Sequence, residues 1–362
     1  MILLSGGTGF TGSLLAKALI ERGASLRLIG RSQHRLEKLA EKLKGDVELV
    51  VADMGVPAAL QKAMEGVSVA VSAVGPYQQI GEPFFKAALT TRTPYVDICA
   101  EQFFLRDMYE RFESKVRRAG IPVVMGMGVA PALADWAANI CSEGLVRPAI
   151  TINHALEKYR PSRGIRQTAM AQMAHPIEIW EQDRWEPVTF SQLTGTTVFP
   201  SPYGQRETSC FPAGAVMTIP RHVDAERVIG YLALVGDASF ARWFSLATSA
   251  LTPALPALLN SPVGAFLSAE SGRDLPFPPV ANHESKFAVL VQASTKNQAT
   301  QMAVLGADPY ETTAQIAAAA TIHIAEHPAA LRPGMHAPSE AFSPVDWLQK
   351  LSEDGIIEVF KA

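Results

Sequence analysis

The sequence predicts an α/β protein, in which a doubly wound parallel sheet is followed by a second, mixed α/β domain. Over the first 125 residues, short apolar runs rich in β-branched residues alternate with helical stretches. Further along the chain, strands with inserted helices replace this alternation. The length of 362 residues also fits two domains of roughly 150 residues or more each.

The first domain is expected to alternate strands and helices throughout. The expected strands are Ile2–Leu4, Leu26–Ile29, Val47–Val51, Val67–Ala73, Tyr95–Ile98 and Pro122–Met125. The expected helices are Gly12–Arg22, Gln33–Leu43, Pro57–Glu65, Glu82–Thr91 and Phe103–Arg118. Because consecutive parallel strands need a crossover connection, helices between them indicate a parallel sheet. The glycines and proline of Gly126–Pro131 predict a boundary that gives domains 1–127 and 128–362.

The second domain is expected to build one mixed sheet. Its predicted strands are Ala149–Ala155, Val188–Phe190, Ala215–Ile219 and Lys286–Ala293, and its predicted helices are Ala132–Ile140, Arg163–Ala174 and Thr312–Glu326. The C-terminal residues 338–362 are candidates to pack back on the first domain. The uncharged segment Phe244–Ala269 has the length of a membrane helix, but three prolines interrupt it. We therefore expect short helices over a substrate or at a dimer contact, and contact with a membrane surface stays open.

Composition excludes several classes of protein. Hydrophobic residues make up 48% and charged residues 19%, which is typical of a globular chain. The net charge of −3 offers no basic surface for nucleic acid. Cys99, Cys141 and Cys210 are widely spaced and lack a CxxC pair, so no disulfide framework and no metal site are expected. The N-terminus resembles no signal peptide, and a reducing, cytoplasmic location is expected.

A glycine-rich turn links the first strand to the first helix. Gly6, Gly9 and Gly12 have the spacing Gly-x-x-Gly-x-x-Gly. Glycines allow a tight turn and the close approach of a pyrophosphate, and the helix N-terminus supplies N–H donors. The context of strand, turn and helix predicts a dinucleotide-binding site of Rossmann type. The residues expected to bind the dinucleotide here are Gly6, Thr8, Gly9, Phe10, Thr11 and Gly12.

The end of the second strand predicts which dinucleotide binds. A site that prefers NAD places an acidic residue there, but the chain has Arg31 and Ser32, with Arg35 one turn further on. A guanidinium group suits a 2′-phosphate, so the cofactor expected is NADP. Asp53, after the third strand, is expected to face the adenine amino group or, alternatively, to cap the helix near Pro57.

Residues after the fourth strand are expected to border the nicotinamide, because ligands lie outside the carboxyl ends of parallel strands. These are Val74, Gly75 and Pro76. Tyr77 follows them, and it either donates a hydrogen bond to the substrate or packs in the core.

Three other chemistries are not supported. No tyrosine has a lysine four residues later, which excludes the Tyr-x-x-x-Lys pair of short-chain dehydrogenases. No Gly-x-Ser-x-Gly sequence provides a hydrolase nucleophile. His323–His327 has the spelling of a zinc peptidase motif, but Pro328 ends the helix and few residues follow, so the match is interpreted as chance.

Several motifs together resemble the saccharopine dehydrogenase-like superfamily, nearest to its trans-acting enoyl reductases and saccharopine dehydrogenase-like oxidoreductases. The specific motifs are Gly6–Gly12, Gly30–Ser32, Val74–Tyr77 with Gly81-Glu82, and Tyr95–Asp97 with Glu101. Looser matches are Gly128–Pro131, Thr218–Arg221, Gly306–Tyr310 and Ala337–Phe342. Two positions depart from the pattern, Ala100 and Ala132, where relatives often have glycine.

The resemblance implies an NADP-linked reductase, with Gly128 also near the cofactor and a second domain that often mediates dimerisation. Such proteins reduce either a conjugated C=C bond in a lipid or polyketide or an imine. The apolar segment favours the enoyl-type reaction on an apolar small molecule, and imine reduction and a non-catalytic NADP-binding role stay open. The expected catalytic residues are Tyr77, Asp97 and Tyr159. Further cleft candidates are Glu101, Asp135, His154, Lys158 and Arg160, for which a structural role competes.

Overall fold

The computed structural model describes residues 1–173, 175–188, 193–235 and 284–361. Within these residues the chain forms two compact units, neither of which is continuous in sequence. The first unit comprises Met1–Cys99, Phe104–Val129 and Tyr310–Ala337. The second unit comprises Ala100–Phe103, Ala130–Pro309 and Pro338–Ala362.

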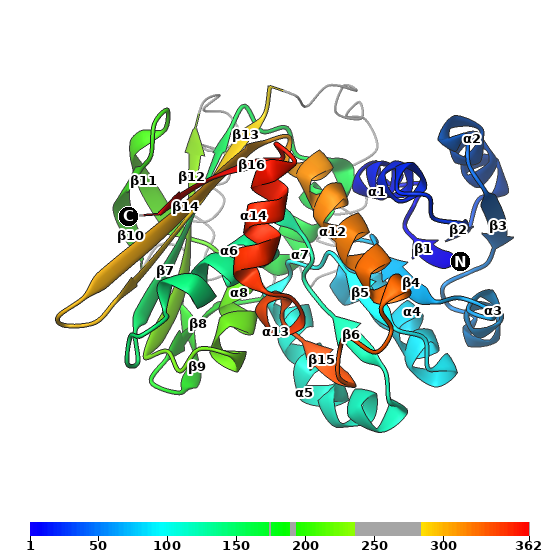
Figure 1. The fold of residues 1–362 in the computed structure, drawn as a ribbon, viewed down its shortest axis with the longest axis horizontal. Coiled ribbons are helices and arrows are strands. Elements are labelled where there is room, and N and C mark those ends of the chain that lie inside the picture. Colours follow the sequence, from blue (N-terminus) through cyan, green and yellow to red (C-terminus); the bar gives the residue numbers. More distant parts are fainter. Residues whose placement is uncertain (174, 189–192, 236–283, 362) are drawn as a thin grey trace. The chain divides into compact units, whose positions relative to one another are not determined.

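The first unit contains a seven-stranded parallel sheet (Figure 1). Its strands are β1 (Ile2–Ser5), β2 (Leu26–Gly30), β3 (Val47–Val51), β4 (Val69–Ser72), β5 (Tyr95–Asp97), β6 (Pro122–Val124) and β15 (Gly334–His336). They follow the order β15-β6-β5-β4-β1-β2-β3. Apart from β15 this is the doubly wound order of a Rossmann sheet, so the predicted fold class is confirmed. The order reverses between β1 and β4, where ligands bind in such folds.

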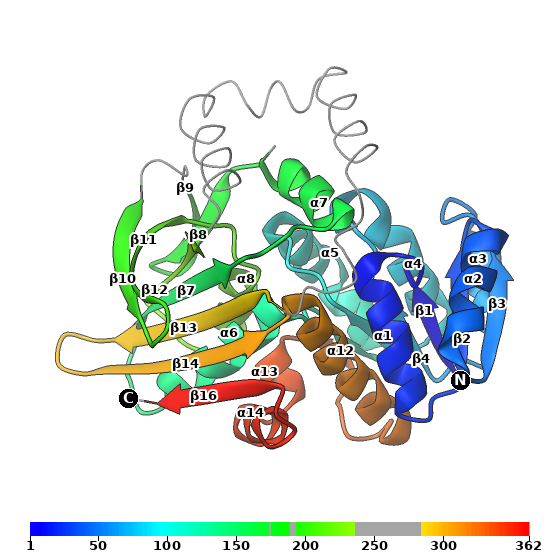
Figure 2. The same ribbon diagram turned by 90° about the horizontal axis from the view of Figure 1, so that it is seen from above.

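Helices in the crossover connections cover this sheet. They are α1 (Phe10–Glu21), α2 (Gln33–Leu43), α3 (Pro57–Ala63), α4 (Tyr77–Thr91) and α5 (Gln102–Ala119), and α12 (Pro309–Glu326) joins them from far along the chain. Helix α12 lies beside α1, and the rings of Phe10 and Tyr310 meet edge to face with centroids 4.8 Å apart (Figure 2). The central strand β1 is buried throughout, which agrees with its continuous apolar sequence.

The second unit contains a nine-stranded mixed sheet. Its strands are β7 (Ala149–Glu157), β8 (Ile177–Glu181), β9 (Arg184–Val188), β10 (Thr194–Phe199), β11 (Gly204–Cys210), β12 (Arg227–Val235), β13 (Lys286–Ser294), β14 (Ala299–Ala307) and β16 (Ile357–Lys361). The main path follows the order β10-β11-β12-β7-β13-β14-β16, and β8 pairs with β12 and β9. Strand β7 is parallel to β12 and antiparallel to β13, as predicted for a mixed sheet.

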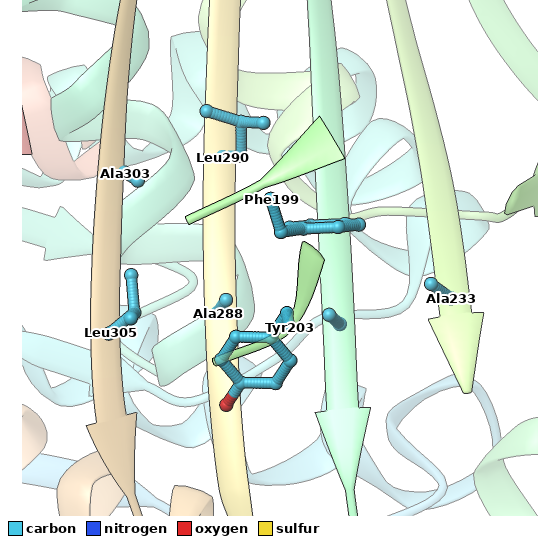
Figure 3. Close-up of a cluster of buried hydrophobic side chains, with 8 residues drawn as sticks. Phe199, Tyr203, Ala233, Ala288, Leu290, Ala303 and Leu305 are labelled. Atoms are coloured by element: carbon cyan, nitrogen blue, oxygen red, sulfur yellow. The ribbon is translucent and has the colours of Figure 1, made fainter. Parts of the chain in front are cut away.

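The β10–β11 hairpin, at one end of this sheet, packs over one face of the strands β7, β13 and β14. Phe199 and Tyr203 lie against small and branched side chains on β13 and β14 (Figure 3). Ala155 of β7 belongs to the same buried cluster. Because neighbouring residues of a strand point to opposite faces, His154 of β7 projects from the other face.

Short helices complete the second unit. They are α6 (Val129–Cys141), α7 (Arg163–Met173), α8 (Ala215–Thr218), the 3₁₀ turn η1 (Ile219–Arg221), α13 (Pro338–Ala341) and α14 (Pro344–Glu353). The prediction of a strand at Ala215–Ile219 was wrong, because this run forms α8 and enters η1. A short, mainly apolar run fits a buried strand and a buried helical turn equally well, so its pattern alone does not distinguish them.

The organisation of the chain differs from the predicted domains 1–127 and 128–362. The first unit extends to Val129 and also includes residues 310–337. The C-terminal residues 338–362 belong to the second unit, where β16 pairs with β14. The predicted segment Phe244–Ala269 lies outside the described residues, as does the part of the predicted strand Val188–Phe190 that follows Val188.

Candidate dinucleotide-binding site

The glycine-rich turn after β1 leaves no room for side chains at two positions. Gly6 has φ +83°, and a Cβ atom there would lie 2.4 Å from the carbonyl oxygen of Ala73. A Cβ atom at Gly12 would lie 2.0 Å from the carbonyl oxygen of Gly6. The turn is closed by a hydrogen bond of 2.9 Å from the Gly9 N–H to the Gly6 carbonyl. These contacts explain why glycine is required at both positions.

The turn leads directly into the N-terminus of α1. Gly9 is the N-cap residue and has no side chain to occupy the N–H groups of the first helical turn. The neighbouring Thr8 and Thr11 belong to the same turn and helix start. Free N–H donors and the positive end of the helix dipole together suit a pyrophosphate. The predicted cradle therefore has the geometry that a dinucleotide needs.

Two arginines lie at the end of β2. The Arg35 guanidinium donates a hydrogen bond of 2.8 Å from Nη2 to the Thr8 carbonyl, which holds it against the glycine-rich turn. The Ser32 hydroxyl accepts from the Arg35 N–H at 3.4 Å and caps α2. Arg31 is exposed, and no acidic residue follows β2 in the segment Gly30–Arg35. This arrangement of positive charge fits a 2′-phosphate and lacks the carboxylate that would bind an unmodified ribose.

Asp53 forms a turn of its own at the end of β3. Its Oδ1 accepts a hydrogen bond of 2.8 Å from the Gly55 N–H. Val56 is the N-cap residue of α3, and no side chain caps that helix. The alternative interpretation of Asp53 as the cap of the helix near Pro57 was therefore wrong. Contact of its carboxylate with adenine stays a prediction.

The segment after β4 lies against the glycine-rich turn. The Ala73 N–H donates to the Ser5 carbonyl at 2.9 Å, and the Ala73 carbonyl fills the space beside Gly6. Val74, Gly75 and Pro76 follow directly, and Pro76 is the N-cap residue of α4. They thus lie at the point where the strand order reverses, which is where the nicotinamide half was expected.

Gly128 lies between β6 and α6, in the same unit. Its N–H donates to the Gly126 carbonyl at 2.9 Å, and the residue is buried. Its contact with the cofactor stays a prediction.

Tyr77 is buried, and its hydroxyl joins two strand ends. The hydroxyl donates a hydrogen bond of 2.6 Å to the Ser72 carbonyl and accepts one of 3.3 Å from the Ile98 N–H. Its ring lies 5.5 Å from that of Phe104. Burial, followed by the negative charge of Asp97, raises the pKa of Tyr77 well above its ordinary value. These contacts assign Tyr77 a structural part in joining β4 to β5.

Asp97 is fully buried and links the ends of β5 and β6. Its Oδ1 accepts hydrogen bonds from the N–H groups of Cys99, at 3.0 Å, and Gly126, at 2.9 Å. Its carbonyl accepts from the Met127 N–H at 2.7 Å. Both Tyr77 and Asp97 therefore shape the carboxyl edge of the sheet. The third predicted catalytic residue, Tyr159, lies in the second unit two residues after β7 and is half-buried.

The second unit holds a buried network around Asp135, the one member of it that the sequence analysis named as a candidate. Asp135 is fully buried, and its Oδ2 accepts from the Thr218 hydroxyl at 2.5 Å and lies 3.0 Å from His222 Nε2. Its Oδ1 accepts from the Ser339 N–H at 2.8 Å. His222 was not predicted. Its only sequence signal was its position directly after the matched segment Thr218–Arg221.

The two members of this pair stabilise each other's charged forms. Burial opposes ionisation of Asp135, but His222, Ser339 and Thr218 outweigh it and lower the pKa of the carboxyl group. Burial likewise opposes protonation of His222, but the charge and hydrogen bond of Asp135 raise the pKa of the imidazole. The network ties α6 to the chain after β15 within this unit.

Among the other candidates in the second unit, Glu101 is buried and its Oε1 accepts a hydrogen bond of 3.1 Å from the Thr168 hydroxyl. Within the described part of the chain, no group of three or more His, Cys, Asp or Glu side chains is arranged to hold a metal ion. No described helix is both long and apolar enough to cross a membrane.

Comparison with known proteins agrees with the geometry of the first unit. Residues 2–124 match the family model of the saccharopine dehydrogenase NADP binding domain. This part of the chain belongs to that domain family. The match covers the glycine-rich turn, both arginines after β2, and the strand ends that carry Tyr77 and Asp97.

Curated relatives match about a third of this chain. The chain is 34% identical over 132 residues to a trans-acting enoyl reductase of Mycobacterium ulcerans, covering 35% of this chain and 32% of the relative. It is 29% identical over 151 residues to a saccharopine dehydrogenase-like oxidoreductase of Mus musculus, covering 37% of this chain and 35% of the relative. The matches thus span about a third of the length of these curated relatives.

The fold of the chain is similar to that of a solved saccharopine dehydrogenase. An apo saccharopine dehydrogenase (L-Glu forming) of Saccharomyces cerevisiae matches with a TM-score of 0.65 and 15% identity. The match covers 100% of this chain and 99% of that one. At this identity the likeness concerns the fold, including the mixed second sheet.

Proposed function

We propose that the protein is an NADPH-dependent reductase that transfers hydride to an activated C=C bond of a small, apolar or lipid-like metabolite. The observation that carries the cofactor assignment is the arginine pair after β2 beside the glycine cradle, with Arg35 Nη2 held 2.8 Å from the Thr8 carbonyl. A 2′-phosphate would find two guanidinium groups here and no competing carboxylate. The resemblance to enoyl reductases supports the choice of reaction.

The residues of the first unit would position the cofactor by its phosphates. The first-turn N–H groups of α1 bind the pyrophosphate, Arg31 and Arg35 bind the 2′-phosphate, and Val74–Pro76 with Gly128 border the ring. When bound, NADPH supplies the hydride. Reduction of an enone at its β-carbon leaves an enolate, which needs a hydrogen-bond donor and then a proton.

Tyr77 and Asp97 support this site indirectly, because their polar atoms bind backbone groups at the strand ends. We propose that they act as positioning residues. Tyr159 remains a predicted catalytic residue, and its role in the reaction is not assigned. A homodimer in the cytoplasm is expected with this function, and sedimentation or light scattering tests the oligomer.

Two other functions compete. Reduction of an imine formed from an amine and a keto acid would use the same cofactor site, but it needs charged partners for the carboxylates of the substrate. A non-catalytic NADP-binding protein would share the fold, since the fold alone does not determine chemistry.

Turnover separates these alternatives. Oxidation of NADPH, followed by its absorbance, is expected with trans-2-hexenoyl-N-acetylcysteamine, an α,β-unsaturated thioester. The cyclic imine 1-pyrroline is the probe for the second function. Turnover of the imine alone would replace the enoyl-type reaction by imine reduction. Micromolar NADPH binding without turnover of either probe would favour the non-catalytic role.

The cofactor assignment has its own test. Arg31→Ala is expected to weaken NADPH at least 10-fold more than NADH, because a charge-assisted hydrogen bond to the 2′-phosphate contributes about 1.5–3 kcal/mol. The matched control is Lys42→Ala, which removes the same charge from the last turn of α2. Equal loss of affinity for both dinucleotides would refute the 2′-phosphate assignment.

A further inference from the structure

The glycine-rich turn has few side chains with which to hold its own position. Its glycines have none, and the first large side chain after them is Phe10, the first residue of α1. The backbone N–H groups at this helix start are the predicted donors to the pyrophosphate. The position in which the ring of Phe10 is held therefore helps to set the direction of these donors.

Tyr310 contacts that ring from α12, a helix near the other end of the chain. The two rings meet edge to face, with an interplanar angle of 87°, and Tyr310 is 4% exposed. Edge-to-face pairs stabilise beyond the apolar area that they bury. The carbonyl of Phe10 accepts a hydrogen bond of 2.8 Å from the Ser13 hydroxyl. The ring and the backbone of the first helical residue thus both have fixed partners.

A second contact of α12 reaches the turn after β6. Thr313 Oγ1 accepts a hydrogen bond of 3.1 Å from the Val129 N–H. Val129 directly follows Gly128, which is predicted to border the nicotinamide and has no side chain to fix its position. On its other side this turn is held by Asp97, whose Oδ1 accepts from the Gly126 N–H. The turn is therefore held between a strand end and α12.

Both contacts come from one face of a well-anchored helix. Tyr310 and Thr313 are three residues apart in α12, which places them on the same side of it. Further along, α12 buries Ile316 and Ile324 among other apolar residues. All these residues belong to the first unit. One helix face thus contacts the start of α1 and the turn that contains Gly128.

We propose that Tyr310 and Thr313 are positioning residues for the dinucleotide, and that this face of α12 sets the spacing between the pyrophosphate cradle and the nicotinamide border. Tyr310 acts through the ring of Phe10, and Thr313 acts through the N–H of Val129. The inference rests on the proposed cofactor site. It adds two residues that lie outside the family match at residues 2–124.

The Thr313 contact should affect one end of the cofactor only. We compare NADPH with adenosine 2′,5′-bisphosphate, which has the adenosine half of the cofactor but no nicotinamide. Thr313→Val keeps the shape of the side chain and leaves the Val129 N–H without its acceptor. We expect the Kd of NADPH to rise about 5-fold or more and that of the bisphosphate to stay within twofold. Thr313→Ser, which keeps the hydroxyl, should bring the Kd of NADPH back towards the wild-type value.

The Tyr310 contact should affect both ligands, because it acts on the phosphate cradle. Tyr310→Leu is expected to raise both Kd values about 5-fold or more, and Tyr310→Phe, which keeps the ring, should stay within twofold of the wild type. The matched control is Phe112→Leu, which breaks another edge-to-face pair of the first unit, with Phe85 at 5.1 Å between centroids. It should lower the Tm by a similar amount and keep both Kd values within twofold.

A purely structural role of the two residues gives a different pattern. The inference is overturned if the Kd of NADPH is unchanged in either variant, if Thr313→Val weakens both ligands equally, or if Phe112→Leu weakens them as much as Tyr310→Leu. These binding measurements need no turnover, so they decide the inference even where the protein reduces neither probe and the reductase function fails. A wild-type protein that binds no NADPH would refute the cofactor assignment and the inference together.

Discussion

The substitution Gly12→Ala tests whether the turn after β1 is a cradle for a pyrophosphate. An alanine Cβ would lie 2.0 Å from the carbonyl oxygen of Gly6 and 2.7 Å from its carbonyl carbon. Both contacts are with backbone atoms, so no side chain can rotate away. Ordinary contacts of a Cβ atom begin near 3.4 Å, which means that the turn or the start of α1 must move by about 1.4 Å.

A displacement of that size is large compared with the tolerance of a hydrogen bond. N–H groups that bind a phosphate oxygen near 2.9 Å lose most of the interaction beyond about 3.5 Å. If one or two charge-assisted bonds of about 1.5–3 kcal/mol each are lost, the free energy of NADPH binding falls by about 3 kcal/mol. This corresponds to an increase of about 100-fold in Kd. Overpacking should also lower the free energy of unfolding by about 1–3 kcal/mol.

The assay is titration of NADPH followed by fluorescence, with the Tm measured on the same preparations. The control is Gly23→Ala at the other end of α1, where φ is +80° but no atom lies within 4 Å of the added Cβ. That variant should lose stability through backbone strain and keep the Kd of NADPH within about threefold. An unchanged Kd for Gly12→Ala, or an equal rise for Gly23→Ala, would refute the reasoning.

Two further predictions concern buried polar contacts. Tyr77→Phe leaves two backbone groups at the strand ends without their partner, so we expect a loss of about 1–3 kcal/mol in the free energy of unfolding; a large fall in kcat at full stability would instead indicate a proton donor. The pair of Asp135 and His222 should stabilise the fold most between about pH 4 and 6.5. Because the pKa of His222 is raised, its contribution to stability is complete below about pH 6.5 and is lost as the pH rises through the folded-state pKa. Because the pKa of Asp135 is lowered, its contribution to stability is complete above about pH 4 and is lost as the pH falls through the folded-state pKa. Thermal melting of His222→Gln should therefore show a flatter decline than the wild type from pH 6.5 to 9, and parallel curves would contradict this.

The first unit was predictable because its pattern is local. The predicted helix Gln33–Leu43 agrees with α2 at both ends, since Ser32 caps it and apolar residues recur at helical spacing. Strands such as Val47–Val51 are likewise short apolar runs that end in turn residues. The strand β15 was missed, because three residues carry no periodic signal and their pairing with β6 spans about two hundred residues of chain.

The candidate site was likewise predictable only in part. The glycine spacing located the cradle, and residue types after β2 indicated the 2′-phosphate site. The roles of Tyr77 and Asp97 could not be predicted from the sequence, because they depend on which backbone groups lie close together at the strand ends. His222 is a single residue without a motif around it. What distinguishes it is burial and its contact with Asp135, which sequence patterns do not contain.

The return of residues 310–337 to the first unit has a consequence for the order in which this chain can fold on the ribosome. Before α12 and β15 of the first unit can be made, the 180 residues from Ala130 to Pro309 must be made. At roughly 5–20 residues per second, that interval lasts about 9–36 s. Throughout it, the edge of β6 and the flank of α1 that α12 later covers stay open. We therefore expect chaperones to bind the early nascent chain. A fragment that ends after β6 should aggregate, and the same fragment with residues 310–337 fused to it should stay in solution.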